Sequence, residues 1–201
     1  PDGSAVVAWY DRSEGALWWS RMTGPGFSEP EMLAGWGHPD PDRDGDMGAN
    51  VDLTIDIDGQ AHLCFQDGLT DSLRYLAPGL DRDEWVDDGV WLDVGGRGHS
   101  VHVVGEDCNI IIDRGGRPAI VYQDSTMQAL LIRRRDTVTP DLVDGWGRRR
   151  ALRGDGGEAM GSFGFYTSAE MSGNQLWVIH FVYRNHLEEP AHGLELLTIE
   201  L

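Results

Sequence analysis

The chain has 201 residues, of which 40% are hydrophobic, and its formal net charge is −18. This length and composition suit one globular domain or one large all-β domain, and no apolar run approaches the roughly 18 residues that a membrane span requires. The strong negative charge argues against nucleic acid and anionic membrane surfaces as partners, because both repel an acidic protein.

The first predicted element is a hairpin over residues 7–19, VAWYDRSEGALWW, in which two apolar runs flank a polar turn that begins at Asp11. The pattern recurs as LCFQDGLTDSLRY at 63–75, with Asp67 in place of Asp11, and as IVYQDSTMQALLI at 120–132, with Asp124. An aspartate in this position can accept hydrogen bonds from the amides of its own turn. Because one active site does not need three copies, the recurrence favours a structural role in the turn.

The segment HPDPDRDGDMG (38–48) has the pattern of the front half of a calcium loop, with aspartates at alternate positions before Gly45. Val51 stands where an EF-hand would have its glutamate, so the ligand set needs carboxylates from elsewhere. The candidate ligands are Asp40, Asp42, Asp44, Asp46 and Asp52. We predict a bound Ca²⁺ here; the alternative is an acidic loop that charge and glycine keep soluble and flexible.

A longer repeat extends the hairpins, because residues 51–67 match residues 108–124 without a gap at an offset of 57. Alternation of apolar and polar residues in VDLTIDI predicts a half-buried strand, and DIDG and DRGG have turn compositions. Each unit is expected to contain four short antiparallel strands, which in the second unit lie near 50–56, 60–66, 72–76 and 88–93.

The two cysteines, Cys64 and Cys108, fall inside apolar strand-like runs. We expect buried free thiols, with a disulfide as the alternative if the two strands prove to be adjacent.

Four further residues are candidates for ligand binding. His99 and His102 in HSVH could contact a ligand, although one histidine pair without a third ligand is weak support for a metal. Trp18 aligns with Arg74 and Leu131 and is therefore expected to be exposed, and Trp36 lies in a predicted loop. Exposed tryptophans beside carboxylates are typical of sugar-binding surfaces.

The repeat divides the chain into four units at about 1–37, 46–94, 103–153 and 158–201, the first and last being incomplete. The fourth copy is weaker and spans 167–181, with Gly173 in the place of Gly116. Four-stranded units of this length predict the blades of an all-β propeller. The stretch IDIDGQAHLCFQDGLTDSLRYL (55–76) and its copies resemble the repeats of secreted bacterial β-propeller proteins, in the style of BNR/sialidase-like repeats.

The sialidase-type Asp-box, Ser-x-Asp-x-Gly-x-x-Trp, is not intact. The nearest segment, SAEMSGNQLW (168–177), has Glu170 in place of the aspartate and one extra residue before Gly173. The resemblance implies a propeller fold and an exported protein, extracellular or periplasmic.

The strand count predicts the C-terminal part of a ring of about six to eight blades, completed by an N-terminal portion or by a partner protein. The predicted function is non-catalytic binding or scaffolding through the loop rim, with calcium as the expected cofactor. One alternative is a glycan-binding, lectin-like propeller. The other is a sialidase-like glycoside hydrolase, for which no residue is assigned a catalytic role, because an acidic chain offers many plausible carboxylate pairs.

Overall fold

The computed structural model describes residues 5–80, 82–88, 90–92, 99–135, 145–147, 150–154, 161–184 and 191–201. These ranges contain β-strands and two 3₁₀ turns, η1 (Pro41–Arg43) and η2 (Pro78–Leu80), and no α-helix lies within them. No helix in these ranges is long and apolar enough to cross a membrane. The prediction of an all-β chain is confirmed.

Four antiparallel sheets follow one another along the chain. Sheet 1 contains β1 (Val6–Asp11), β2 (Ala16–Thr23), β3 (Gly26–Phe27) and β4 (Glu31–Gly35), and sheet 2 contains β5 (Met47–Ile55), β6 (Ala61–Asp67), β7 (Ser72–Ala77) and β8 (Arg82–Asp87). Sheet 3 contains β11 (Val104–Ile112), β12 (Pro118–Asp124), β13 (Ala129–Arg134) and β14 (Arg150–Arg153), and sheet 4 contains β15 (Ser162–Ser172), β16 (Gln175–Arg184) and β17 (Ala191–Glu200). The strands β9 (Val90–Leu92) and β10 (His99–Val101) form a separate hairpin.

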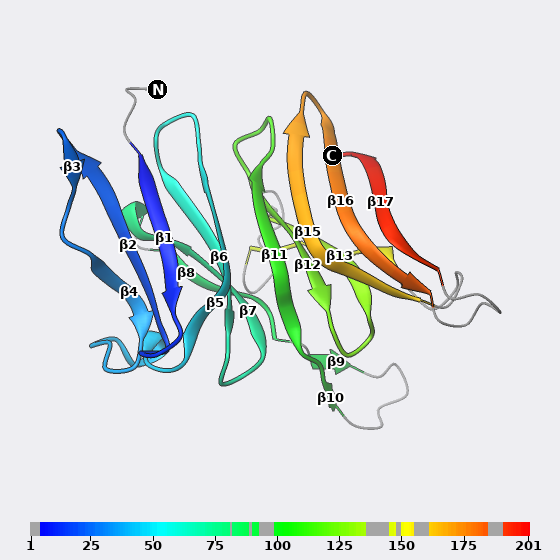
Figure 1. Ribbon diagram of the computed structural model, residues 1–201, viewed down its shortest axis with the longest axis horizontal. Helices are drawn as coiled ribbons and strands as arrows, with labels where there is room; N and C mark the ends of the chain where they lie inside the picture. The colour runs from blue at the N-terminus through cyan, green and yellow to red at the C-terminus, as the bar shows by residue number, and fades with distance from the viewer. Residues whose placement is uncertain are drawn as a thin grey trace.

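The sheets are stacked in a row, with sheet 1 at one end and sheet 4 at the other (Figure 1). Successive side chains of a strand point to opposite faces, so one strand supplies two interfaces. In β6, Leu63 and Phe65 pack with Leu17 and Trp19 of sheet 1, whereas Cys64 packs against sheet 3. A third cluster fills the space between sheets 3 and 4. Sheets 2 and 3 are therefore covered on both faces, which explains why β6 and β12 are buried along their whole length.

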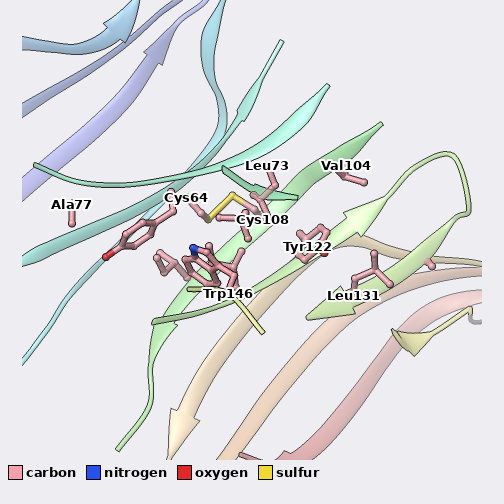
Figure 2. Packing of buried hydrophobic residues seen from close by; sticks show 13 residues of the cluster. Cys64, Leu73, Ala77, Val104, Cys108, Tyr122, Leu131 and Trp146 are labelled. Carbon is pink, nitrogen blue, oxygen red and sulfur yellow. A yellow bond between two sulfur atoms is a disulfide. The ribbon is translucent and has the colours of Figure 1, made fainter. Parts of the chain in front are cut away.

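A disulfide joins sheets 2 and 3. Cys64 of β6 is bonded to Cys108 of β11, and their Cα atoms are 6.4 Å apart. Figure 2 shows this bond within the apolar cluster that also holds Tyr122 and Trp146. The prediction of free thiols is wrong and the alternative holds, because β11 crosses the face of sheet 2 on which Cys64 lies.

The fourth strand of the second unit is β8, at Arg82–Asp87, and not at 88–93 as predicted. Within β8, Trp85 lies opposite Arg74 of β7, and the Arg74 guanidinium sits 4.2 Å from the centre of its ring. The prediction placed the strand after this tryptophan, whereas the tryptophan is part of the strand. The segment that begins at Val90 pairs with β10 instead.

In the fourth unit, the side chains of β16 are shifted by one residue relative to the ungapped alignment of this unit with the third. The alignment pairs Tyr122 with Ile179, yet Tyr122 is buried against sheet 2 and Ile179 is exposed on the outer face of sheet 4. The cause is the turn between β15 and β16, where the pair Ser172 and Gln175 encloses only two residues. A slip of one residue turns every side chain of a strand to the other face.

Candidate functional site

The predicted calcium segment forms the connection between β4 and β5. Asp40 precedes η1, and its Oδ1 accepts a hydrogen bond from the amide of Asp42 at 3.1 Å. The carboxylate of Asp44 accepts one from the amide of Gly37 at 2.8 Å. These two carboxylates therefore stabilise the conformation of the connection through hydrogen bonds within it.

The two remaining candidate ligands face neighbouring sheets. Asp46 accepts a hydrogen bond from the hydroxyl of Tyr10 at 2.6 Å, and this bond raises the pKa of Tyr10 to about 12. Asp52 lies within β5 and accepts a hydrogen bond from the amide of Ile110 in sheet 3 at 2.9 Å. Burial raises the pKa of Asp52. Across the described part of the chain, no three His, Cys, Asp or Glu side chains are grouped so that they could hold a metal ion.

The three repeated aspartates occupy the same place in their hairpins, at the end of β1, β6 and β12. In each hairpin Oδ1 of the aspartate accepts hydrogen bonds from amides two or three residues further on. The shortest of these bonds are Ser13 to Asp11 at 2.8 Å, Leu69 to Asp67 at 2.9 Å and Met127 to Asp124 at 2.8 Å. Such bonds hold the tight turn between two strands.

In two hairpins the other oxygen of the aspartate faces a basic side chain. Oδ2 of Asp124 lies 2.8 Å from Nδ1 of His102, and both side chains are buried. Oδ2 of Asp67 lies 3.6 Å from Nη1 of the buried Arg74. His102 is therefore an interior residue and not the surface ligand that the sequence suggested. His99 belongs to β10, but its side chain lies outside the described residues.

An aromatic hollow lies on the outer face of sheet 1. Trp9 and Trp18 are directly opposite each other on β1 and β2, on the face turned away from sheet 2, since Leu17 and Trp19 use the other face. The hollow has a volume of about 320 Å³ and is lined by Trp9, Asp11, Glu14, Trp18 and Pro30. Flat indole surfaces beside carboxylates are able to stack against and hydrogen-bond a sugar ring.

Trp36 does not line this hollow. Its side chain is 56% exposed and lies over the turn at Gly15, where an added Cβ would come within 2.8 Å of the indole. Gly15 has a φ of 60°, so the turn needs glycine both for its backbone conformation and for the space that Trp36 occupies.

The arginines at the end of β13 and directly after it form hydrogen bonds or ion pairs. Arg134 forms an ion pair with Asp113 at 2.9 Å, Arg135 forms one with Glu84 of sheet 2 at 2.5 Å, and Nε of Arg133 donates to the carbonyl of Gly147 at 2.9 Å. These side chains tie sheet 3 together and to sheet 2, and they do not converge on a common acidic ligand.

A feature that the sequence prediction missed is a repeated bulge in β5, β11 and β15. These are the first strands of sheets 2, 3 and 4 and are called the inner strands below. Each has a glycine with positive φ, followed two residues later by another residue with positive φ. The pairs are Gly48 and Asn50, Gly105 and Asp107, and Gly164 and Tyr166. The ladder register is broken at these places. The offset of 57 already relates Gly48 to Gly105 and Asn50 to Asp107 and could have revealed the bulge.

The bulges bring each inner strand close to the preceding sheet. A Cβ on Gly48 would lie 2.7 Å from Cβ of Leu17, and one on Gly105 would lie 3.1 Å from Cα of Leu73. The bulge also directs polar groups to the next sheet, because the carboxylate of Asp107 accepts a hydrogen bond from the amide of Tyr166 at 2.8 Å. Glycine at positions 48 and 105 is thus required by packing between sheets.

No protein-family model matches the chain, and no curated protein matches it. Among solved structures, the crystal structure of 1,3Gal43A, an exo-β-1,3-galactanase from Clostridium thermocellum, is similar with a TM-score of 0.44 and 10% sequence identity. The similarity covers 98% of this chain and 43% of the galactanase chain, so the chain spans less than half the length of that protein.

Proposed function

We propose that the four sheets are consecutive blades of a larger β-propeller, which acts as a non-catalytic binding or scaffold module through its loop rim. The observation that carries this proposal is a repeated contact between inner strands. Asp52 of sheet 2 accepts a hydrogen bond from Ile110 of sheet 3, and Asn109 of sheet 3 accepts one from Ala169 of sheet 4 at 3.1 Å. Equal contacts between successive units are what a propeller requires.

The two outer faces of the stack support a larger ring. Trp9 aligns with Phe65 and Tyr122, which are 1% and 0% exposed against the preceding sheet, whereas Trp9 itself is 36% exposed. At the other end, Trp177, Ile179 and Tyr183 of β16 are exposed together. Further blades, from an N-terminal portion or from a partner protein, would cover both faces. The proposed total stays at about six to eight blades.

The disulfide supports an exported location. Disulfides persist in the oxidising extracellular space and the bacterial periplasm and are rare in the cytosol. We therefore propose that the protein is extracellular or periplasmic.

Calcium remains a proposed ligand of segment 38–48, supported by its alternating aspartates. Binding would require the loop to rearrange, since no three acidic side chains of the described residues are grouped so that they could hold an ion. Ca²⁺ that binds the folded state raises the melting temperature, and the Asp42→Asn variant should lose that increase. Asp58→Asn, an exposed aspartate in another turn, is the matched control. Equal melting temperatures with Ca²⁺ and with chelator would end this proposal.

A second candidate function is glycan binding at the hollow that contains Trp9 and Trp18, and it excludes a further blade against this face of sheet 1. The specific support is the pairing of two indoles with two carboxylates in one depression. A glycan array should then give hits that the Trp18→Ala variant loses and the Trp36→Ala variant keeps. Loss of binding in both variants, or in neither, would argue against this surface.

The main proposal is tested by native and denaturing mass measurement on material purified without dissociation. A native mass above that of one chain, which resolves into this chain and additional blades, supports it. A native mass equal to a single copy of this chain contradicts it.

A further inference from the structure

The last strand of sheet 4 has an open edge. In sheets 2 and 3 a fourth strand lies beyond the third, as β8 does on β7 and β14 does on β13. Strand β17 pairs with β16 over ten residues without a break in register, and no strand among the described ranges pairs with its other edge. In Figure 1 this strand forms the end of the row. Such an edge presents unpaired backbone donors and acceptors to an incoming strand.

A hollow lies beside this edge, between β17 and the outer strand of sheet 3. Its volume is about 330 Å³, and it is lined by Arg150–Arg153 of β14 and Leu196–Ile199 of β17. Arg153 is engaged in an ion pair with Glu195 at 2.9 Å, whereas Arg150 is exposed. The hollow thus combines aliphatic walls with a basic side chain, and its volume can hold one large side chain.

The comparable place between sheets 2 and 3 is filled by an aromatic side chain. Trp146, which precedes β14, is 1% exposed and packs edge-on against Tyr75 of β7 at 5.3 Å between ring centres. Its indole Nε1 donates to Glu84 of β8 at 2.9 Å. The outer part of sheet 3 therefore inserts an aromatic group against the outer strands of the sheet before it.

The charge at the two places is reversed. Glu84 lies opposite Tyr75 in the β7–β8 ladder, and Arg150 lies opposite Ile132 in the β13–β14 ladder. Tyr75 and Ile132 are related by the offset of 57, so Arg150 stands where sheet 2 has Glu84. Charge complementarity favours a carboxylate on a strand that reaches Arg150, where sheet 3 brings an indole N–H and a guanidinium to Glu84.

We propose that the free edge of β17 binds an extended peptide strand that carries an aromatic side chain for the hollow and an acidic side chain for Arg150. This goes beyond the proposed propeller function, because it depends only on the edge and the hollow and not on a closed ring. A chain of net charge −18 repels an acidic strand in general. Binding of such a strand would therefore indicate a local attraction to Arg150.

The probe is the synthetic peptide LDRDEWVDD, the sequence of residues 80–88 that forms β8 on β7 in sheet 2. We expect saturable binding by calorimetry, with protection of β17 amides from hydrogen exchange. Replacing the peptide tryptophan with alanine should abolish binding. The Arg150→Glu variant should bind about tenfold more weakly, whereas Arg12→Glu, the same charge change on an exposed turn of sheet 1, should leave Kd unchanged.

Three results would overturn the proposal, given circular dichroism that shows both variants folded. The first is no saturable binding up to about 1 mM peptide, the weakest affinity that counts as specific here. The second is an equal loss for Arg150→Glu and Arg12→Glu. The third is a change in exchange at β7 without protection of β17, which would mean that the peptide only displaces β8.

Discussion

Asp52 and Asn109 occupy equivalent positions on neighbouring inner strands, and each accepts a hydrogen bond from a backbone amide of the following sheet. The two side chains have the same shape, but one carries a charge and the other does not. The contact between sheets therefore depends on an acceptor oxygen and not on the charge of the group that carries it.

This relationship predicts that Asp52→Asn is tolerated and Asp52→Leu is not. Asparagine keeps the acceptor for the Ile110 amide, whereas leucine leaves that amide unpaired at a cost of about 1–3 kcal/mol. The free energy of unfolding from urea titrations measures both. Equal destabilisation by the two substitutions would show that the acceptor contributes nothing.

The same pair predicts a pH effect. Burial raises the pKa of Asp52 above its ordinary value of 3.8, so ionisation of this carboxyl opposes folding at a pH above its folded pKa. The cost disappears as the pH falls below the ordinary value. Asp52→Asn should thus be at least as stable as the parent at pH 7, and its advantage should shrink toward pH 3. An advantage that grows on acidification would contradict the assignment.

The disulfide between Cys64 and Cys108 should contribute about 2–4 kcal/mol to stability, because it closes a loop between two sheets in the unfolded chain. The double variant Cys64→Ala, Cys108→Ala should lose this amount in urea unfolding. Since both sulfurs are buried, a mild reductant should leave the native bond intact and cleave it only in denaturant. Rapid reduction of the folded protein would place the bond at the surface.

The inner-strand bulge predicts different costs for two glycine substitutions. Gly48 and Gly59 both have positive φ, and alanine there costs about 1–2 kcal/mol from the backbone alone. At Gly48 a Cβ also meets Leu17 at 2.7 Å, whereas at Gly59 it meets nothing within 4 Å. Gly48→Ala should therefore cost about 1–3 kcal/mol more than Gly59→Ala in denaturant unfolding. Similar costs would mean that sheets 1 and 2 are packed less tightly than described.

Much of the fold could be predicted because the signals are local. Period-two alternation and turn residues beginning at Asp11, Asp67 and Asp124 specify hairpins, and their spacing specifies four antiparallel sheets. The errors arose where a distant contact or a turn length decides. The two-residue turn before Gln175 reverses the faces of β16, and the Cys64–Cys108 bond depends on which strand crosses sheet 2.

The site could be predicted less well, since candidate ligands were chosen by spacing along the chain. Alternate aspartates in 38–48 are compatible with a metal, but Asp40 is used to cap a 3₁₀ turn and Asp46 to bind Tyr10. His102 is buried because it meets Asp124, which lies 22 residues away in the sequence. Only the fold brings these two side chains together.

The central claim is that successive sheets meet in the same way, and an engineered disulfide tests it most directly. Ala8 and Val51 occupy, between sheets 1 and 2, the positions that Cys64 and Cys108 occupy between sheets 2 and 3. In the Ala8→Cys, Val51→Cys variant we expect a second disulfide, so that no thiol is alkylated in denaturant without reductant. The pair Ala8→Cys, Ile57→Cys, with its second cysteine in an exposed turn, should keep both thiols free. A folded Ala8→Cys, Val51→Cys variant with two reactive thiols would show that the contact between sheets does not repeat.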